Sequence, residues 1–111
     1  MKNNAKPKIT AEYYRSAVKN RKSIKNQKEI LKDYAHNQNI ENHQHYIDNG
    51  FSGSSLERPA LKKLINDIKQ GKISTVVVSD ISRLSRNYME LPILEKIFKE
   101  NGVEFVALQK Y

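Results

Sequence analysis

The sequence contains no cysteine, and its 12 acidic residues are far outnumbered by 20 lysines and arginines. Without cysteine, disulfides and thiolate-bound metals are excluded, and a reducing cytosolic setting is permitted. No apolar run reaches the roughly 20 residues needed to cross a bilayer, and the basic segment 1–8 leads into no apolar signal core. We therefore expect a cytoplasmic protein with no membrane partner.

The shortage of acidic residues leaves a net charge of +8 on 111 residues. Such an excess favours an anionic partner, because clustered cations gain affinity by releasing counterions from phosphate polymers. Charge alone does not identify that partner. Many of the lysines fall at spacings that would also keep one helix face solvated: Lys19, Lys22, Lys25, Lys28 and Lys32.

The length predicts one domain, residues 8–111, after a flexible polar leader over residues 1–7. Alternation from Ile9 to Tyr14 predicts a first strand that turns at Arg15 and Ser16. Ser23 is a plausible N-cap for a helix ending near residues 36–39. Tyr46 and Ile47 indicate a second short strand.

Glycines and serines over residues 51–55 predict a mobile loop, a candidate active-site loop. Pro59 then begins a helix that Gly71 ends. Residues 73–80 form the most apolar stretch, typical of a strand covered on both faces. A third helix from about Leu91 to Gly102 and a last strand over residues 103–108 complete the order.

Strands that alternate with helices predict an α/β layered domain. The buried strand over residues 73–80 further indicates a mostly parallel sheet of four or more strands, flanked by helices. The carboxyl ends of parallel strands meet at one edge of the sheet, where ligands of such folds bind. That edge would receive Arg15 with Ser16, Asp48 with the glycine-serine loop, and residues 80–86.

Arg83 and Arg86 stand three residues apart directly after the apolar strand. Arginine is the side chain best shaped to hold phosphate oxygens by paired hydrogen bonds, so we expect a phosphate ligand, in a basic protein that of nucleic acid. The simpler interpretation is a solvated helix start with ordinary ion pairs.

Metal chemistry has little support in the sequence, and we expect no metal, cofactor or small-molecule ligand. The crevice lacks a dense carboxylate cluster able to hold two magnesium ions. His43 and His45 stand two residues apart, as metal ligands in a strand can, but no third ligand is apparent in the sequence. A receiver domain, which needs an acidic pair after the first strand, is disfavoured by the positive charge of Arg15 at that place.

Five ordered blocks across residues 13–106 resemble the catalytic domain of serine recombinases, the resolvase and invertase family, and most of all the large members from mobile elements. The blocks are residues 13–15, 23–27, 46–54, 57–61 and 80–87. The resemblance implies a resolvase-like fold and metal-free DNA cleavage and rejoining, through a phosphoserine link to DNA within a tetramer.

The same resemblance implies roles for individual residues. Arg15, Arg83 and Arg86 match the arginines that bind the scissile phosphate, and Arg58 matches a further basic residue near it. Gln27 and Asp48 match polar members of the site. Asp80 lies where larger relatives also tend to carry an acid and would orient an arginine.

The family's nucleophile position departs from the pattern, because Ala17 occupies it and Ser16 stands immediately before. A methyl group cannot attack phosphorus. Either Ser16 is the nucleophile, or the domain binds DNA or a recombinase partner without cutting, or Ala17 is an engineered replacement. Tyr14, beside Arg15, is a further candidate nucleophile.

The sequence stops at Tyr111, just after the last predicted strand. The resemblance implies that relatives continue into a long dimerisation helix and a DNA-binding region. We therefore expect these residues alone to bind DNA weakly and to recombine nothing, whether they are an excised domain or a natural fragment. Self-association, as dimer or tetramer, is expected of the full-length protein.

Overall fold

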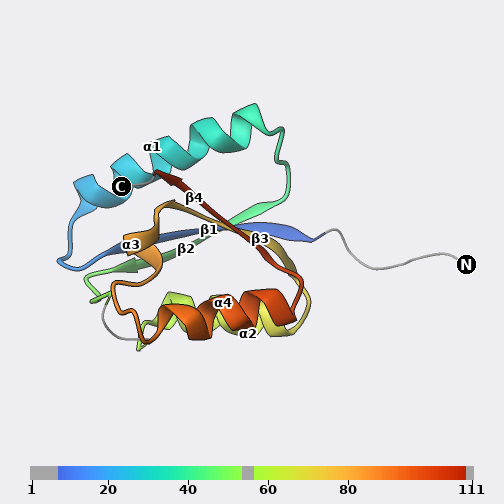
Figure 1. The fold of residues 1–111 in the computed structure, drawn as a ribbon. Helices are drawn as coiled ribbons and strands as arrows, with labels where there is room; N and C mark the ends of the chain where they lie inside the picture. The colour runs from blue at the N-terminus through green and yellow to red at the C-terminus, as the bar shows by residue number, and fades with distance from the viewer. Residues whose placement is uncertain (1–7, 54–56, 110–111) are drawn as a thin grey trace, which may run out of the picture.

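Four parallel strands form one sheet in the order β2-β1-β3-β4 in this computed structural model, which describes residues 8–53 and 57–109 (Figure 1). The strands are β1 (Ile9–Ser16), β2 (His43–Asn49), β3 (Ile73–Asp80) and β4 (Glu104–Gln109). The central pair, β1 and β3, carries the apolar positions, and the more polar β2 lies at an edge. The parallel sheet predicted from the apolar stretch at residues 73–80 is confirmed.

Helices cover both faces of the sheet. In the described residues, α1 (Arg21–Asn37) lies on one face, and α2 (Pro59–Lys69) and α4 (Leu91–Glu100) lie on the other (Figure 1). A single turn, α3 (Ile81–Leu84), follows the carboxyl end of β3. The predicted layered α/β fold is therefore confirmed, and α3 is an addition that the sequence did not separate from the arginine segment.

The core consists of two layers because successive strand side chains point to opposite faces. Tyr13 packs in the larger cluster with Leu61, Leu64 and Phe98, beneath α2 and α4. The next residue, Tyr14, packs on the other face with Ile24, Leu31 and Val77, beneath α1. This alternation sends Arg15 toward the α2 side and Glu12 toward the α1 side.

Helix ends follow local chemistry, with one correction. Asn20, not Ser23, caps α1, because its side-chain oxygen accepts a hydrogen bond of 3.1 Å from the Ser23 amide. Gly71 and Gly102 follow α2 and α4 with φ of +77° and +66°, as predicted for left-handed helix stops. Residues 1–7 and Ser54 and Ser55 of the predicted loop lie outside the described residues.

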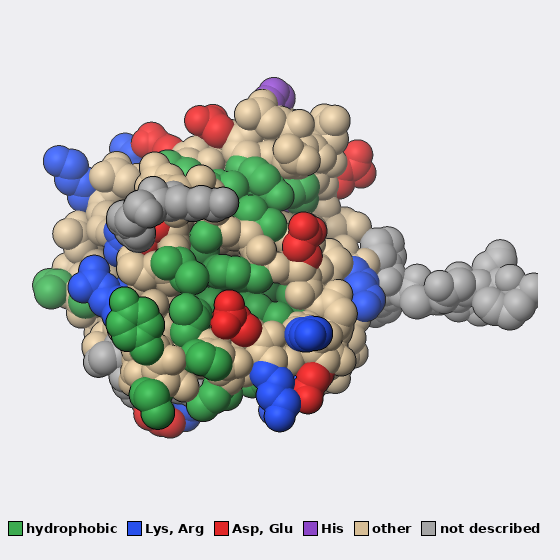
Figure 2. All heavy atoms as spheres, viewed as in Figure 1, with side chains coloured by type: hydrophobic (Ala, Val, Ile, Leu, Met, Phe, Trp, Pro, Cys, Tyr) green, Lys and Arg blue, Asp and Glu red, His purple; other side chains and the backbone are tan. Residues whose placement is uncertain are grey.

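The β4 edge is only partly covered. Its residues Phe105 to Leu108 are half-buried, and hydrophobic side chains gather at the centre of the face in Figure 2, where β4 runs between α1 and α4. None of the described helices is long and apolar enough to span a bilayer.

Candidate active site

The carboxyl ends of β1, β2 and β3 meet beside α3, as the parallel order requires (Figure 1). β1 and β2 stay paired to their last residues, Ser16 opposite Asn49. The loop after β2 is held to β1, since the Ser16 carbonyl accepts hydrogen bonds from the Gly50 and Phe51 amides at 2.7 and 3.0 Å. The predicted convergence of the three strand ends is present.

Arg15 is fully buried and its guanidinium binds backbone carbonyls. It donates to the Phe51 carbonyl at 3.0 Å, the Ser82 carbonyl at 2.8 Å and the Arg83 carbonyl at 3.2 Å. These bonds join the end of β1 to the loop after β2 and to α3. Arg15 therefore assembles the edge of the sheet from inside.

Gly53 lies against this guanidinium. A β-carbon at position 53 would stand 2.7 Å from both Cζ and one terminal nitrogen of Arg15. The absence of a side chain is therefore what lets the loop close over Arg15. The Gly53 carbonyl in turn accepts a hydrogen bond of 2.9 Å from the Arg86 amide.

Asp48 and Arg58 are both buried and are connected through Tyr13. Arg58 donates to the Tyr13 hydroxyl at 3.1 Å, and that hydroxyl donates to the Asp48 carboxylate at 2.7 Å. Burial raises the pKa of Tyr13 well above its ordinary value, against the nearby charge of Arg58, so Tyr13 stays protonated. Arg58 also donates to the Leu84 carbonyl at 2.6 Å.

Asp48 also caps α2 from a distance. Its two carboxylate oxygens accept hydrogen bonds from the Ala60 amide at 2.8 Å and the Leu61 amide at 3.0 Å. Arg58, the residue before the helix, makes no side-chain cap of its own. The Asp48 carboxylate therefore lies at the positive, N-terminal end of the α2 dipole.

Arg83 reaches the surface, with 26% of its side chain exposed. Its Nε lies 3.5 Å from the Asp80 carboxylate, and its terminal nitrogen donates to the Arg15 carbonyl at 3.2 Å. Asp80 caps α3 by accepting from the Ser82 amide at 3.1 Å. Asp80 thus lies in ion-pair contact with Arg83 at the start of α3.

Arg86 is exposed, and its charge is felt at Arg15. The pKa of the Arg15 guanidinium is lowered from its ordinary value, first by burial, next by the charge of Arg58, and further by Arg86 and Arg83. The charges of three further arginines therefore reach Arg15. Arg58 is buried like Arg15, whereas Arg83 and Arg86 lie at or near the surface.

Gln27 of α1 is buried against the end of β1. Its side-chain oxygen accepts from the Arg15 amide at 3.3 Å, and its nitrogen donates to the Arg15 carbonyl at 3.0 Å. The pairing of β1 with β3 stops at Glu12 and Val77. The Gln27 amide thus takes the place of a neighbouring strand where β1 and β3 separate.

A cavity of about 250 Å³ opens beside this separation. Gln27, Asp80 and Arg83 line it together with Ser23 of α1. Most of the residues that line it are polar or charged.

Ser16 is 6% exposed, and its hydroxyl donates to the Val18 carbonyl two residues on. Ala17 is exposed in the bend that follows β1. The residue that carries a hydroxyl is thus turned inward, and the residue that faces outward has only a methyl group. Tyr14 lies on the α1 face of the sheet, where its hydroxyl is 2.6 Å from His45 Nδ1.

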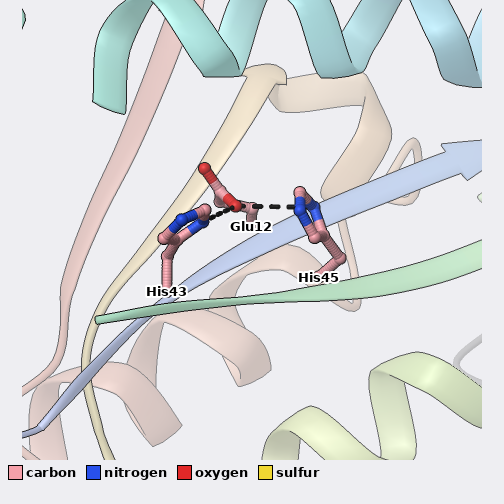
Figure 3. A group of neighbouring side chains, drawn as sticks. All are labelled: Glu12, His43 and His45. Carbon is pink, nitrogen blue, oxygen red and sulfur yellow. Dashed lines mark hydrogen bonds and ion pairs between the residues drawn. The ribbon is translucent and has the colours of Figure 1, made fainter. Parts of the chain in front are cut away.

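Neither acid at these strand ends is positioned for a metal. Asp48 and Asp80 accept hydrogen bonds from helix amides and lie among arginines that repel a cation. On the α1 face, by contrast, Glu12 joins His43 and His45 (Figure 3). This third potential ligand is not apparent in the sequence, because Glu12 lies about 30 residues away along the chain and meets the histidines only through the pairing of β1 with β2.

Tyr13 was missed as a member of the arginine network. The alternation of side chains in β1 predicts that Tyr13 lies in the core, and it does. Its hydroxyl also connects Arg58 to Asp48. The only sequence signal for this role is a tyrosine near the end of a strand in a basic site. That signal does not distinguish a tyrosine that only packs its ring from one whose hydroxyl also connects two charged groups.

The fold and the arginine cluster define a parallel α/β domain with basic side chains at its strand ends. The family model described as resolvase, N terminal domain, matches residues 10–111. The chain therefore belongs to the resolvase N-terminal domain family.

Two curated relatives match part of the chain. A putative DNA recombinase of Bacillus subtilis is 41% identical over 61 residues, and the Tn917 transposon resolvase of Enterococcus faecalis is 33% identical over 58 residues. The matches cover 55% and 52% of this chain but only 12% and 30% of those proteins. The chain therefore corresponds to a small part of either relative.

Solved structures agree over most of the chain. The N-terminal catalytic domain of TP901-1 integrase matches with a TM-score of 0.83 and 36% identity, covering 91% of this chain and 78% of that one. A serine recombinase from Sulfolobus solfataricus matches with a TM-score of 0.79 and 31% identity, covering 96% and 71%. The fold is thus that of a serine recombinase catalytic domain.

Proposed function

We propose that this domain binds the phosphodiester backbone of DNA at the strand ends, through Arg83 and Arg86 with Arg15 and Arg58 behind them. The observation that carries the proposal is that Arg15 and Arg58 donate hydrogen bonds to the short segment that carries Arg83 and Arg86, which brings four guanidinium groups to one edge of the sheet. An anion at this edge relieves their mutual repulsion. Arginine binds phosphate oxygens by paired hydrogen bonds, so a phosphodiester fits the arrangement.

The two buried arginines have a supporting role in this proposal. Arg15 and Arg58 donate to backbone carbonyls of Ser82, Arg83 and Leu84, and so hold the segment that carries the surface arginines. A fixed positive group is worth more at a reacting phosphate than a mobile one, because little reorganisation is needed. Arg83 and Arg86 are the groups that we expect to touch DNA.

We further propose that the domain as it stands binds DNA without cutting it. Cleavage of this kind needs a hydroxyl oxygen to form a bond to phosphorus while a phosphorus–oxygen bond to deoxyribose breaks and the leaving oxygen gains a proton. Ala17 supplies no oxygen, and the Ser16 hydroxyl is buried and bound to the Val18 carbonyl. Small displacements of a nucleophile cost large factors in rate.

Cleavage by Ser16 is the second candidate function. Among the described residues, its hydroxyl bonds to a local carbonyl two residues away, in the bend that leads to α1. A rearrangement of that bend would release the hydroxyl toward the arginines. The two candidates share DNA binding and differ only in whether a covalent link forms.

Binding can be tested by nuclear magnetic resonance titration of the labelled chain with a 12-base-pair duplex of mixed sequence at low salt. We expect the largest shifts at the Arg83 and Arg86 amides and side chains, and at least fivefold weaker binding for Arg86→Ala. Lys62→Ala is the control, because Lys62 is paired with Glu57 on α2. Shifts spread evenly over all exposed lysines would contradict the proposed site.

The covalent step can be tested with a randomised pool of nicked duplexes, followed by mass spectrometry of the protein. We expect no protein–DNA adduct from the chain as it is, and an adduct at residue 17 from Ala17→Ser. An adduct on Ser16 that disappears in Ser16→Ala would establish the second candidate instead. If Ala17→Ser binds DNA but forms no adduct, these residues alone do not suffice for the reaction.

A further inference from the structure

Glu12, His43 and His45 form a cluster on the α1 face of the sheet, away from the arginines (Figure 3). Glu12 lies in β1 directly opposite His45 in the paired strand β2, and His43 precedes His45 by two residues on the same face. Both imidazole rings flank the carboxylate and point toward it (Figure 3). The cluster therefore joins the edge strand to its inner neighbour.

The distances suit a small cation. One Glu12 oxygen lies 2.8 Å from His43 Nδ1 and 3.4 Å from His45 Nδ1, and the three potential ligand atoms lie within 4.8 Å of one another. A tetrahedral zinc ion with bonds of about 2.0–2.1 Å places its ligand atoms about 3.3 Å apart. The Glu12–His45 distance already matches this spacing, and the shorter Glu12–His43 contact would have to open by about 0.5 Å to admit the ion.

Glu12 is buried, so a positive charge nearby would stabilise its carboxylate. Its side chain is 3% exposed, and within residues 8–53 and 57–109 no lysine or arginine forms an ion pair with it. A buried carboxylate is costly unless a cation or several hydrogen bonds compensate it. The two imidazoles contact this carboxylate, and a divalent ion between the three groups would supply both ligand bonds and charge.

The surroundings leave room for a fourth ligand. The cluster lines a cavity of about 490 Å³ beneath α1, together with His36, Lys28 and Lys32. A water molecule in this cavity would complete a tetrahedron. The two lysines are exposed, so water screens their charge, but they weaken cation binding and would favour an anion in the same cavity.

Tyr14 competes with a metal for His45. Its hydroxyl lies 2.6 Å from His45 Nδ1. Metal binding exchanges this hydrogen bond and the His43–Glu12 contact for coordination, which predicts moderate affinity.

We propose that Glu12, His43 and His45 form a binding site for a divalent transition-metal ion, best suited to Zn²⁺, that fastens β2 to β1. Two imidazole nitrogens and one carboxylate oxygen are zinc-type ligands, while Mg²⁺ and Ca²⁺ prefer all-oxygen sets. The role is structural, since these side chains lie on the opposite face of the sheet from Arg15. The inference is independent of the proposed DNA binding.

The test is titration of the untagged, chelator-treated chain with Zn²⁺, by calorimetry and by thermal unfolding. We expect one equivalent to bind and the unfolding temperature to rise, with no effect of Mg²⁺ at the same concentration. Glu12→Gln and His45→Ala should each weaken Zn²⁺ binding at least tenfold. His36→Ala is the matched control, because His36 lines the same cavity outside the cluster, and it should bind Zn²⁺ unchanged.

A second measurement needs no variant. Co²⁺ in place of Zn²⁺ should give the intense visible absorption of a four-coordinate site. A weak six-coordinate spectrum, absence of Zn²⁺ binding, or equal loss in His36→Ala and His45→Ala would overturn the assignment. Stabilisation by inorganic phosphate without Zn²⁺ binding would also overturn it and assign the cavity to an anion.

Discussion

At the scale of single residues, Arg15 shows how a cation is used inside the domain. Its charge faces the partial negative charges of three backbone carbonyls instead of a carboxylate. Such hydrogen bonds are directional, so they fix the positions of the loop after β2 and of α3 together. Because two of these carbonyls belong to Ser82 and Arg83, the backbone that carries the surface arginines is fixed as well.

We expect Gly53→Ala to lower the free energy of unfolding by about 1–3 kcal/mol, because overpacking displaces the buried Arg15 guanidinium. Gly53 is not among the glycines with positive φ, so backbone strain plays no part. Urea denaturation measures the loss, and the Arg15 Nε resonance reports the displacement.

Gly71→Ala is the control for that variant. A β-carbon at position 71 would meet nothing within 4 Å, but the φ of Gly71 is +77°, so the cost of about 1–2 kcal/mol is conformational. It should leave the Arg15 resonance in place. A Gly53→Ala protein with unchanged stability and an unchanged resonance would contradict the close contact.

Asp67 makes the stability depend on pH. Although burial opposes ionisation, hydrogen bonds from Tyr46 at 2.7 Å and Lys63 at 3.2 Å hold the pKa of Asp67 below its ordinary value. A lowered folded-state pKa means that the stabilisation is present above the unfolded-state value, about pH 4, and is lost as pH falls through the folded value.

We therefore expect Asp67→Asn to lower the free energy of unfolding at pH 7 by about 1–3 kcal/mol, with the difference shrinking below about pH 4. Urea denaturation at pH 7 and pH 3 provides the measurement. Glu57→Gln, which removes an exposed pair with Lys62, should change little at either pH. An equal deficit at both pH values would argue against ionised Asp67 as the cause.

At the scale of elements, α2 depends on a strand for its cap. Asp48 of β2 accepts from the amides of Ala60 and Leu61, so the start of the helix is positioned by the sheet. Helix caps contribute about 0.5–2 kcal/mol, and a buried carboxylate with three donors lies at the upper end. Strand pairing and helix position are thereby coupled.

Asp48→Asn should lower the free energy of unfolding by about 1–3 kcal/mol, because an amide nitrogen cannot accept from the donors of one carboxylate oxygen. Tyr13→Phe is the matched comparison, since it removes one donor to Asp48 and keeps both helix bonds. Its loss should be smaller in chemical denaturation. A larger loss of stability for Tyr13→Phe than for Asp48→Asn would indicate that the network stabilises the fold mainly through the hydrogen bond of Tyr13 with Arg58.

Sequence periodicity predicted the elements well because each signal is local. Helix spacing before Gly71 and the apolar run in β3 need no knowledge of neighbours. The site was harder, since contacts such as Arg15 with the Ser82 carbonyl join residues 67 apart along the chain. Strand alternation places Glu12 on a face, but only the register with β2 brings it to His45.

At the scale of the whole molecule, the net charge of +8 sets the background for DNA binding. Phosphate contacts release counterions, so affinity falls with salt in proportion to the number of contacts. The surface arginines should add specific contacts to a diffuse background from lysines.

We expect Arg86→Ala to reduce the slope of log affinity against log salt by about 1, the loss of one phosphate contact. Fluorescence anisotropy of a labelled mixed-sequence duplex at several salt concentrations gives the slope. The Lys62→Ala slope should stay within error of the parent. Parallel lines for Arg86→Ala and the parent protein would mean that Arg86 makes no such contact.

The Gln27 amide, standing where β1 and β3 separate, also has a kinetic consequence. The Arg15 amide hydrogen is protected by one side chain instead of a neighbouring strand. A side chain swings away far more readily than a strand detaches, so this hydrogen should exchange with deuterium through local opening, sooner than those of Ala11 or Val77 in the paired part of the sheet. We therefore expect local opening of the central sheet to be most frequent beside the arginines.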